Sequence, residues 1–216
     1  MRTRVLLADD HKILRKGLRS LLEKDFEVVA EAEDGHQAIE YARRLNPDVI
    51  VMDVSMPGLN GIEAAERILA MNKNIHIVAL SVHTDRRFIE KMIAVGAKAY
   101  LPKNCEYDEL ANAIRLVRLG RTYISRQISA AAGTGESYSR FSGEDASRLK
   151  SLTPSEREVL QLVAEGRTSK EIAVILKKSL KSVERYRHAI MEKLDIHSIA
   201  ELTKYAINEG IISLDH

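Results

Sequence analysis

The sequence contains only one cysteine, Cys105, in 216 residues. A single thiol excludes an intramolecular disulfide framework and a cysteine-rich metal site, and it is typical of a protein from a reducing compartment. Long apolar runs are missing as well. No stretch approaches the roughly 18 residues of a membrane-spanning helix, and the apolar stretch near the N-terminus is too short for a signal peptide. We therefore expect a cytoplasmic protein with no membrane partner.

A strong net charge is also absent. The chain has 33 Lys and Arg residues against 31 Asp and Glu residues, a formal charge of +2. Overall charge thus indicates neither nucleic acid nor membrane as a partner, and any basic surface must be local. The length is comfortable for two small domains, each able to bury its own core.

The first part of the chain, to about residue 120, alternates short apolar runs with segments of helical period. The runs occupy residues 5–8, 26–30, 49–52, 75–80 and 97–101. Short runs without polar alternation are typical of parallel strands covered on both faces, and alternation with helices indicates repeated βαβ units. We expect an α/β domain with a five-stranded, parallel, doubly wound sheet of the flavodoxin-like kind.

This pattern dissolves from Ser125 to Lys150, where Ser, Gly and Ala are frequent, and only helical segments follow. The first of these has a predicted capping box, with Thr153 as N-cap and Glu156 three residues later, and Gly166 ends it. The predicted domains are residues 1–122 and a small all-α domain at 148–216. A linker at 123–147 joins them.

Polar side chains follow several of the predicted strands. Because the carboxyl ends of parallel strands share one edge of a sheet, these side chains should meet there. They are Asp9 and Asp10 after the first strand, Asp53 at the end of the third, Ser81 at the end of the fourth and Lys103 past the fifth. Clustered carboxylates need a cation, and oxygen ligands suit Mg²⁺. Asp53 could then be a nucleophile that forms an aspartyl phosphate, with Ser81 and Lys103 on the phosphoryl oxygens.

Each of these residues taken alone has a simpler interpretation. Asp9 and Asp10 could cap the next helix, Lys103 could be a solvated loop residue and Ser81 a turn residue. Their joint placement at successive strand ends favours a shared site.

Four stretches of the first domain carry a family resemblance: LLADDHKILRKGL, VIVMDVSMPGLNG, LSVH and AYLPKN. They resemble the receiver domain of two-component response regulators. The resemblance implies that a histidine kinase phosphorylates Asp53. It also implies that Asp9, Asp10 and Asp53, with the carbonyl of Ser55, hold Mg²⁺.

The same resemblance implies that Lys103 and Ser81 sense the phosphoryl group. Tyr100 would turn inward when the Ser81 hydroxyl engages the phosphate, although a plain core tyrosine is the alternative. The chain departs from many receivers around the lysine, where Pro102 precedes Lys103 and Asn104 follows it, in place of a cis proline after the lysine.

Two further positions affect how long a phosphate would last. Position 55 is Ser where Asn is common in some receivers, and His83 lies two residues past Ser81. Both flank the expected phosphoryl site, so the lifetime of the phosphate does not follow from the family.

Basic residues concentrate around the turn between the second and third helices of the C-terminal domain. A one-sided basic face is typical of a DNA-binding helix-turn-helix, although a solvated surface gives the same pattern. The helix from about Leu180 to Leu194 should present polar side chains to DNA, where Arg pairs with guanine and Glu accepts from cytosine. The candidates are Lys181, Ser182, Glu184, Arg185, Arg187 and His188.

Residues 152–211 resemble the LuxR-type helix-turn-helix, most clearly in LTPSEREVLQLVAEGRTSKEIAVIL and SVERYRHAIMEKL. With the receiver, the chain resembles NarL/FixJ-type response regulators. The resemblance implies base contacts from Glu184, Arg185 and His188, and phosphate contacts from Lys181 and Arg187. It also implies a homodimer on double-stranded DNA with two half-sites.

The favoured function is a transcription regulator controlled by phosphorylation of Asp53, and not an enzyme beyond its own phosphorylation and dephosphorylation. A phosphatase with an Asp nucleophile is one alternative. Such enzymes commonly need a second Asp two residues later as general acid, and that position is Ser55. The other alternative is a receiver whose helical domain binds protein or RNA.

Overall fold

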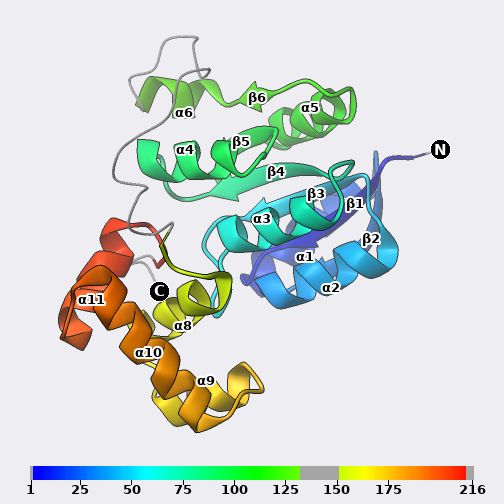
Figure 1. Ribbon diagram of the computed structural model, residues 1–216. Coiled ribbons are helices and arrows are strands. Elements are labelled where there is room, and N and C mark those ends of the chain that lie inside the picture. Colours follow the sequence, from blue (N-terminus) through cyan, green and yellow to red (C-terminus); the bar gives the residue numbers. More distant parts are fainter. Residues whose placement is uncertain (1, 132–150, 213–216) are drawn as a thin grey trace. The chain divides into compact units, whose positions relative to one another are not determined.

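The computed structural model describes residues 2–131 and 151–212. The chain divides into two compact units, Met1–Phe141 and Ser142–His216. The first is a layered α/β domain and the second is helical (Figure 1). Within the described residues, no helix has both the length and the apolar character needed to cross a membrane.

Among the described residues, six strands form one sheet: β1 (Arg4–Ala8), β2 (Glu27–Ala32), β3 (Val49–Asp53), β4 (His76–Ser81), β5 (Ala99–Pro102) and β6 (Tyr123–Ile124). All neighbouring pairs are parallel, in the order β2-β1-β3-β4-β5-β6. The predicted parallel, doubly wound sheet is confirmed. The sixth strand adds to the five predicted, since two residues are too few to show any alternation.

Helices cover both faces of this sheet: α1 (Lys12–Leu22), α2 (Gly35–Leu45), α3 (Gly61–Met71), α4 (Arg86–Ala94) and α5 (Tyr107–Arg118). Successive strand residues enter opposite cores, as the two-residue period of a strand requires. Val5 and Leu7 pack in the core that includes α1 and α5 residues, whereas Leu6 and Ala8 pack in the core of α2, α3 and α4. Burial on both faces explains why the strands read as continuous apolar runs.

The strand order reverses at β1 and β3, and this reversal positions the candidate site. β1 lies between β2 and β3, so the chain is wound outward from this point in both directions. Ligands of open α/β sheets bind at the carboxyl ends of the strands beside such a point. Asp9 follows β1 there, and Asp53 is the last residue of β3.

Gly61 allows α3 to begin directly against the end of β3. Its N–H donates to the carbonyl of Val54 at 2.9 Å. A Cβ at this position would lie 2.0 Å from the carbonyl oxygen of Asp53. Only glycine permits this approach, so residue 61 helps to fix the backbone that carries Asp53.

A short helix, α6 (Arg126–Ala131), follows β6 and packs against β5. The N–H of Ser125 donates to the carbonyl of Tyr100 at 3.0 Å, and the fully buried Ile128 belongs to the same core as Tyr100. β6 and α6 thus fall inside the range predicted as linker, 123–147, most of which lies outside the described residues. The predicted domain limits stay a prediction.

The described part of the second unit contains α8 (Pro154–Ala164), α9 (Ser169–Ile175), α10 (Leu180–Leu194) and α11 (Ile199–Asn208) around one apolar core. The predicted capping box is confirmed, with Thr153 N–H donating to Glu156 at 2.7 Å and Glu156 N–H to the Thr153 hydroxyl at 3.3 Å. Gly166 follows α8 with φ of 81°. A second capping box, which the sequence analysis missed, joins Thr168 and Glu171 at the start of α9.

Candidate functional site

Three carboxylates meet at the carboxyl edge of the sheet. Asp9 and Asp53 are almost completely buried, at 3% and 2% exposed, and Asp10 is partly exposed. One ligand atom from each of Asp9, Asp10, His11 and Asp53 lies within 4.8 Å of all the others. The structure therefore brings the predicted acidic residues together, and His11 joins them.

Lys103 lies between two of these acids. Its Nζ is 2.6 Å from Oδ2 of Asp53 and 2.9 Å from Oδ2 of Asp9. The backbone N–H of Lys103 donates to the carbonyl of Ser81 at 2.8 Å, which extends the β4–β5 pairing of Ser81 with Pro102. The Pro102-Lys103 order thus still delivers the ammonium to Asp53, and the described residues contain no cis peptide bond.

The pKa values in this cluster show opposed effects of burial and charge. Burial raises the pKa of Asp53 to about 7, because the ionised form loses hydration, and the ammonium of Lys103 limits this rise. Burial also disfavours the charged form of Lys103, but its ion pairs with Asp53 and Asp9 outweigh that and raise the pKa of Lys103. One ammonium therefore does not fully offset the cost of burying the ionised carboxylate of Asp53.

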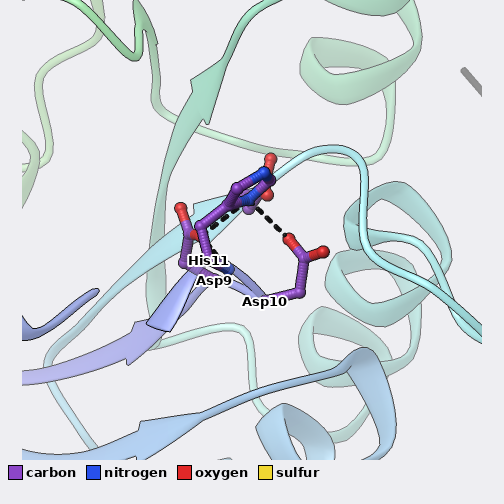
Figure 2. Close-up of side chains that lie close together, drawn as sticks. Asp9, Asp10 and His11 are labelled. Atoms are coloured by element: carbon purple, nitrogen blue, oxygen red, sulfur yellow. Dashed lines mark hydrogen bonds and ion pairs between the residues drawn. The ribbon is translucent and has the colours of Figure 1, made fainter. Parts of the chain in front are cut away.

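His11 is a member of the site that the sequence analysis missed. Figure 2 shows its ring between the carboxylates of Asp9 and Asp10, with Nδ1 3.3 Å and 2.9 Å from their respective Oδ1 atoms. The same Nδ1 lies 3.3 Å from Nζ of Lys103. The position of His11 directly after two acids in the sequence was the feature that could have identified it as a site residue. His11 is itself the N-cap residue of α1, so neither Asp is, although Oδ1 of Asp9 accepts the His11 N–H at 2.7 Å.

Ser55 and His83 form a contact beside Asp53. The N–H of Ser55 donates to Oδ1 of Asp53 at 3.1 Å, and its Oγ lies 3.0 Å from Nε2 of His83. The imidazole stacks on the ring of Phe88 in α4, with centroids 4.3 Å apart. These two positions, which flank the site in the sequence analysis, are thus joined to each other and to α4.

Ser81 and Tyr100 meet His83 through its backbone. The N–H of His83 donates to Oγ of Ser81 at 2.9 Å, and the hydroxyl of Tyr100 donates to the carbonyl of His83 at 3.0 Å. Tyr100 is fully buried, and burial raises its pKa. A continuous series of contacts therefore runs from Asp53 through Ser55 and His83 to Tyr100.

One face of α10 carries four of the six predicted DNA-contacting residues. Lys181, Glu184, Arg185 and His188 follow the three-four spacing of a helix face, and all are exposed. Ser182 is half-buried, and its Oγ lies 2.8 Å from Oγ of Ser179, the N-cap residue of α10.

Arg187 is oriented differently. It lies four residues after the buried Val183 and three before the buried Ile190, so it shares their side of α10. Its Nη1 donates to Oγ of Ser169, the first residue of α9, at 2.5 Å. A DNA contact by Arg187 stays a prediction, and the guanidinium would have to make it from this position.

Tyr186 lies near one basic residue of α10 and one of the turn between α9 and α10. The guanidinium of Arg185 lies 5.6 Å from the centre of its ring, and Nζ of Lys178 lies 5.5 Å from it. Cations over an aromatic ring are weakly attracted by it, which restricts their side chains. Tyr186 thus holds two positive charges close to the exposed face of α10.

Comparison with known proteins assigns both units to families. Residues 5–115 match the response regulator receiver domain, and residues 150–206 match the bacterial regulatory proteins of the luxR family. The chain belongs to the two-component response regulators that combine a receiver with a LuxR-type helix-turn-helix domain, as the sequence resemblance implied.

Individual relatives cover almost the whole chain. It is 35% identical to Response regulator UvrY of Escherichia coli K12 over 98% of this chain and 96% of that protein. It is 38% identical to Transcriptional regulatory protein LiaR of Bacillus subtilis 168 over 97% of this chain and 99% of that protein.

Solved structures show the same relationship. A LuxR-family two-component response regulator from Aurantimonas sp. SI85-9A1 aligns with a TM-score of 0.59 at 35% identity, over 62% of this chain and 96% of that one. The structure of an RcsB–DNA complex aligns with a TM-score of 0.58 at 26% identity, over 97% and 99% of the two chains.

Proposed function

We propose that a sensor histidine kinase phosphorylates Asp53 and that this controls sequence-specific DNA binding by the C-terminal helix-turn-helix. The observation that carries the proposal is the placement of Asp53, a buried carboxylate at the end of β3 with Lys103 at 2.6 Å. The family of the chain supports the same role.

Each residue of the site has a task in phosphoryl transfer. An oxygen of Asp53 attacks the phosphorus of a phosphohistidine, and the P–N bond breaks as the new P–O bond forms. The ammonium of Lys103 pairs with a phosphoryl oxygen and the hydroxyl of Ser81 donates to another. When Ser81 turns toward the phosphoryl group, it shifts the backbone of His83, to which it is hydrogen-bonded. Tyr100 is bonded to the same backbone and moves with it.

The acidic cluster fits Mg²⁺. Its carboxylates present oxygen ligands within 4.8 Å of one another, and they already hold the ammonium of Lys103. Asp9, Asp10 and Asp53 would hold the ion, together with the carbonyl of Ser55. When bound, the ion supplies positive charge to the phosphoryl oxygens.

The C-terminal unit supports double-stranded DNA as the target. A structural relative, RcsB, has been solved in complex with DNA, and a second RcsB structure contains two dimers bound to two parallel DNAs. We infer that Glu184, Arg185 and His188 contact bases and that Lys181 contacts a phosphate, with Ser182 next to Lys181. We also infer that the protein binds two half-sites as a homodimer. The protein would act in the cytoplasm, where its DNA targets are, and would turn over no external substrate.

The assignment of Asp53 is tested by labelling with a small phosphodonor and Mg²⁺. Asp53→Asn should abolish incorporation of a phosphate that hydroxylamine removes, because the amide is not a nucleophile for phosphorus. Asp85→Asn is the matched control, since this exposed acid precedes α4 outside the cluster. Label retained in Asp53→Asn would show that the acceptor lies elsewhere.

The DNA assignment is tested at Arg185. Arg185→Ala should weaken binding to the selected operator by about 1 to 3 kcal/mol and change binding to random DNA little. Gel shifts with operator, random duplex and RNA competitors measure this. An equal loss on operator and random duplex would make Arg185 a phosphate contact, and competition by RNA alone would contradict DNA as the target.

A further inference from the structure

Arg15 is a buried cation with no direct role in the phosphoryl transfer proposed at Asp53. It lies on α1 and is only 4% exposed. Its guanidinium is shared among three acceptors at the ends of β1 and β2: Nη1 donates to the carbonyl of Asp9 at 2.5 Å, Nη2 to Glu33 at 2.7 Å and Nε to Glu31 at 3.3 Å. A buried guanidinium needs such partners, and the planar fork of Arg can reach several at once.

These contacts hold the backbone of Asp9 from both sides. The pairing of β1 with β2 ends at Ala8 and Ala32, and the N–H of Asp9 donates to the carbonyl of Ala32 at 3.1 Å. Arg15 binds the carbonyl of Asp9 and the two glutamates that flank Ala32. It therefore extends the attachment of β1 to β2 by one peptide, the peptide that joins Asp9 to Asp10.

The effect of Arg15 on the acidic cluster is geometric more than electrostatic. Its positive charge is offset by Glu31 and Glu33, and Glu31 also pairs with Arg19 at 2.6 Å. Little of the Arg15 charge remains to attract a metal or to stabilise carboxylates. The peptide that it holds, however, sets the directions in which the side chains of Asp9 and Asp10 leave the strand.

We propose that Arg15 is a positioning residue for the metal site, which fixes the Asp9–Asp10 peptide against β2 so that both carboxylates reach the ion. This inference rests on the proposed Mg²⁺ site. Groups that orient metal ligands without touching the ion typically change affinity by about 10- to 100-fold when removed.

The test is Mg²⁺ binding to the full-length chain, measured by titration calorimetry and by NMR shifts of the Asp9 and Asp10 amides. Arg15→Met should raise the Kd for Mg²⁺ about 10- to 100-fold. The Mg²⁺ concentration for half-maximal labelling by the phosphodonor should rise by the same factor, while the rate at saturating Mg²⁺ changes no more than about twofold. A general loss of structure would lower the saturating rate instead.

Arg19→Met is the matched control. Arg19 also lies on α1 and shares Glu31, but its side chain is 44% exposed and its contacts are with Glu23 and Glu31. It should leave the Kd unchanged. If Arg15→Met does not fold, Glu33→Gln, which weakens one anchor of the guanidinium, should still raise the Kd several-fold.

The outcomes separate the two proposals. No Mg²⁺ binding by the unmodified chain would refute the metal site itself. Normal binding by the unmodified chain with an unchanged Kd in Arg15→Met, or in Glu33→Gln where only that variant folds, would refute the role of Arg15 alone. An equal rise in Kd for Arg19→Met would assign the effect to the charge of α1 and overturn the positional explanation.

Discussion

Each domain contains a buried carboxylate paired with a lysine, and the two pairs behave oppositely. Asp53 and Lys103 are 2.6 Å apart in the receiver, and Glu156 and Lys193 are 2.7 Å apart in the C-terminal domain. Burial raises the pKa of Asp53 to about 7, despite its lysine. Burial acts on Glu156 in the same direction, but hydrogen bonds from Lys193 and Thr153 outweigh it and lower the pKa of Glu156.

The difference lies in what surrounds each pair. Glu156 receives the Thr153 N–H and both of its oxygens are bonded to Lys193, at 2.9 Å and 2.7 Å. Asp53 shares its lysine with Asp9 and has a second acid within reach of the same space. Glu156 is thus satisfied by its neighbours, whereas Asp53 is not, which suits the proposed role of Asp53 as the phosphorylated acid beside a metal ion.

The two acids should therefore change stability with pH in opposite directions. The pKa of Glu156 is lowered by folding, so its contribution is present above its ordinary pKa and is lost as the pH falls through the folded value. The pKa of Asp53 is raised, so ionisation opposes folding, and stability falls as the pH rises from the ordinary value toward about 7.

The largest effect is expected from neutralising the acid of the C-terminal domain. Glu156→Gln should destabilise that domain by about 2 kcal/mol, because Lys193 and the Thr153 N–H lose a charged acceptor. Hydrogen exchange of the full-length chain, followed separately for peptides of each domain, measures it. Glu192→Gln on the exposed side of α10 is the control. A loss no greater than that of the control would mean that the pair is not structural.

Replacing the buried carboxylate of the receiver by an amide should instead stabilise that domain. Asp53→Asn should raise its free energy of unfolding by about 1 kcal/mol at pH 8 without Mg²⁺, because relief from burying a carboxylate outweighs the loss of its ion pair with Lys103. The gain should disappear below about pH 3, where Asp53 is protonated in both the folded and the unfolded state. Denaturant unfolding across this pH range measures it, and destabilisation at pH 8 would end the proposed contrast.

The smallest effect is expected from an exposed ion pair. Glu40 and Arg44 in α2 are 3.9 Å apart, with about three-fifths of each side chain exposed. Glu40→Gln should cost about 0.3 kcal/mol or less, because water screens both charges. If this change matched Glu156→Gln by the same hydrogen-exchange measurement, burial would not be what distinguishes the pairs.

The sequence predicted those features that depend on local patterns. Continuous apolar runs predicted the parallel sheet, and the positions of polar residues at strand ends predicted that Asp9, Asp53 and Lys103 are neighbours. The Thr153 capping box was equally local. Features that depend on side-chain direction or on three-dimensional neighbours were missed: the bond from Arg187 to Ser169, the place of His11 among the acids, and the second strand that Arg15 reaches.

The docking of α6 has a practical consequence for dividing or recombining such proteins. Ile128 fills the same core as Tyr100, and β6 occupies the edge of β5. A receiver cut before Tyr123 would expose an unpaired strand edge, which favours aggregation, and would open a cavity beside Tyr100. Hybrids that exchange receivers between regulators should therefore be joined after Ala131, since the first residues of the connection are structurally part of the receiver.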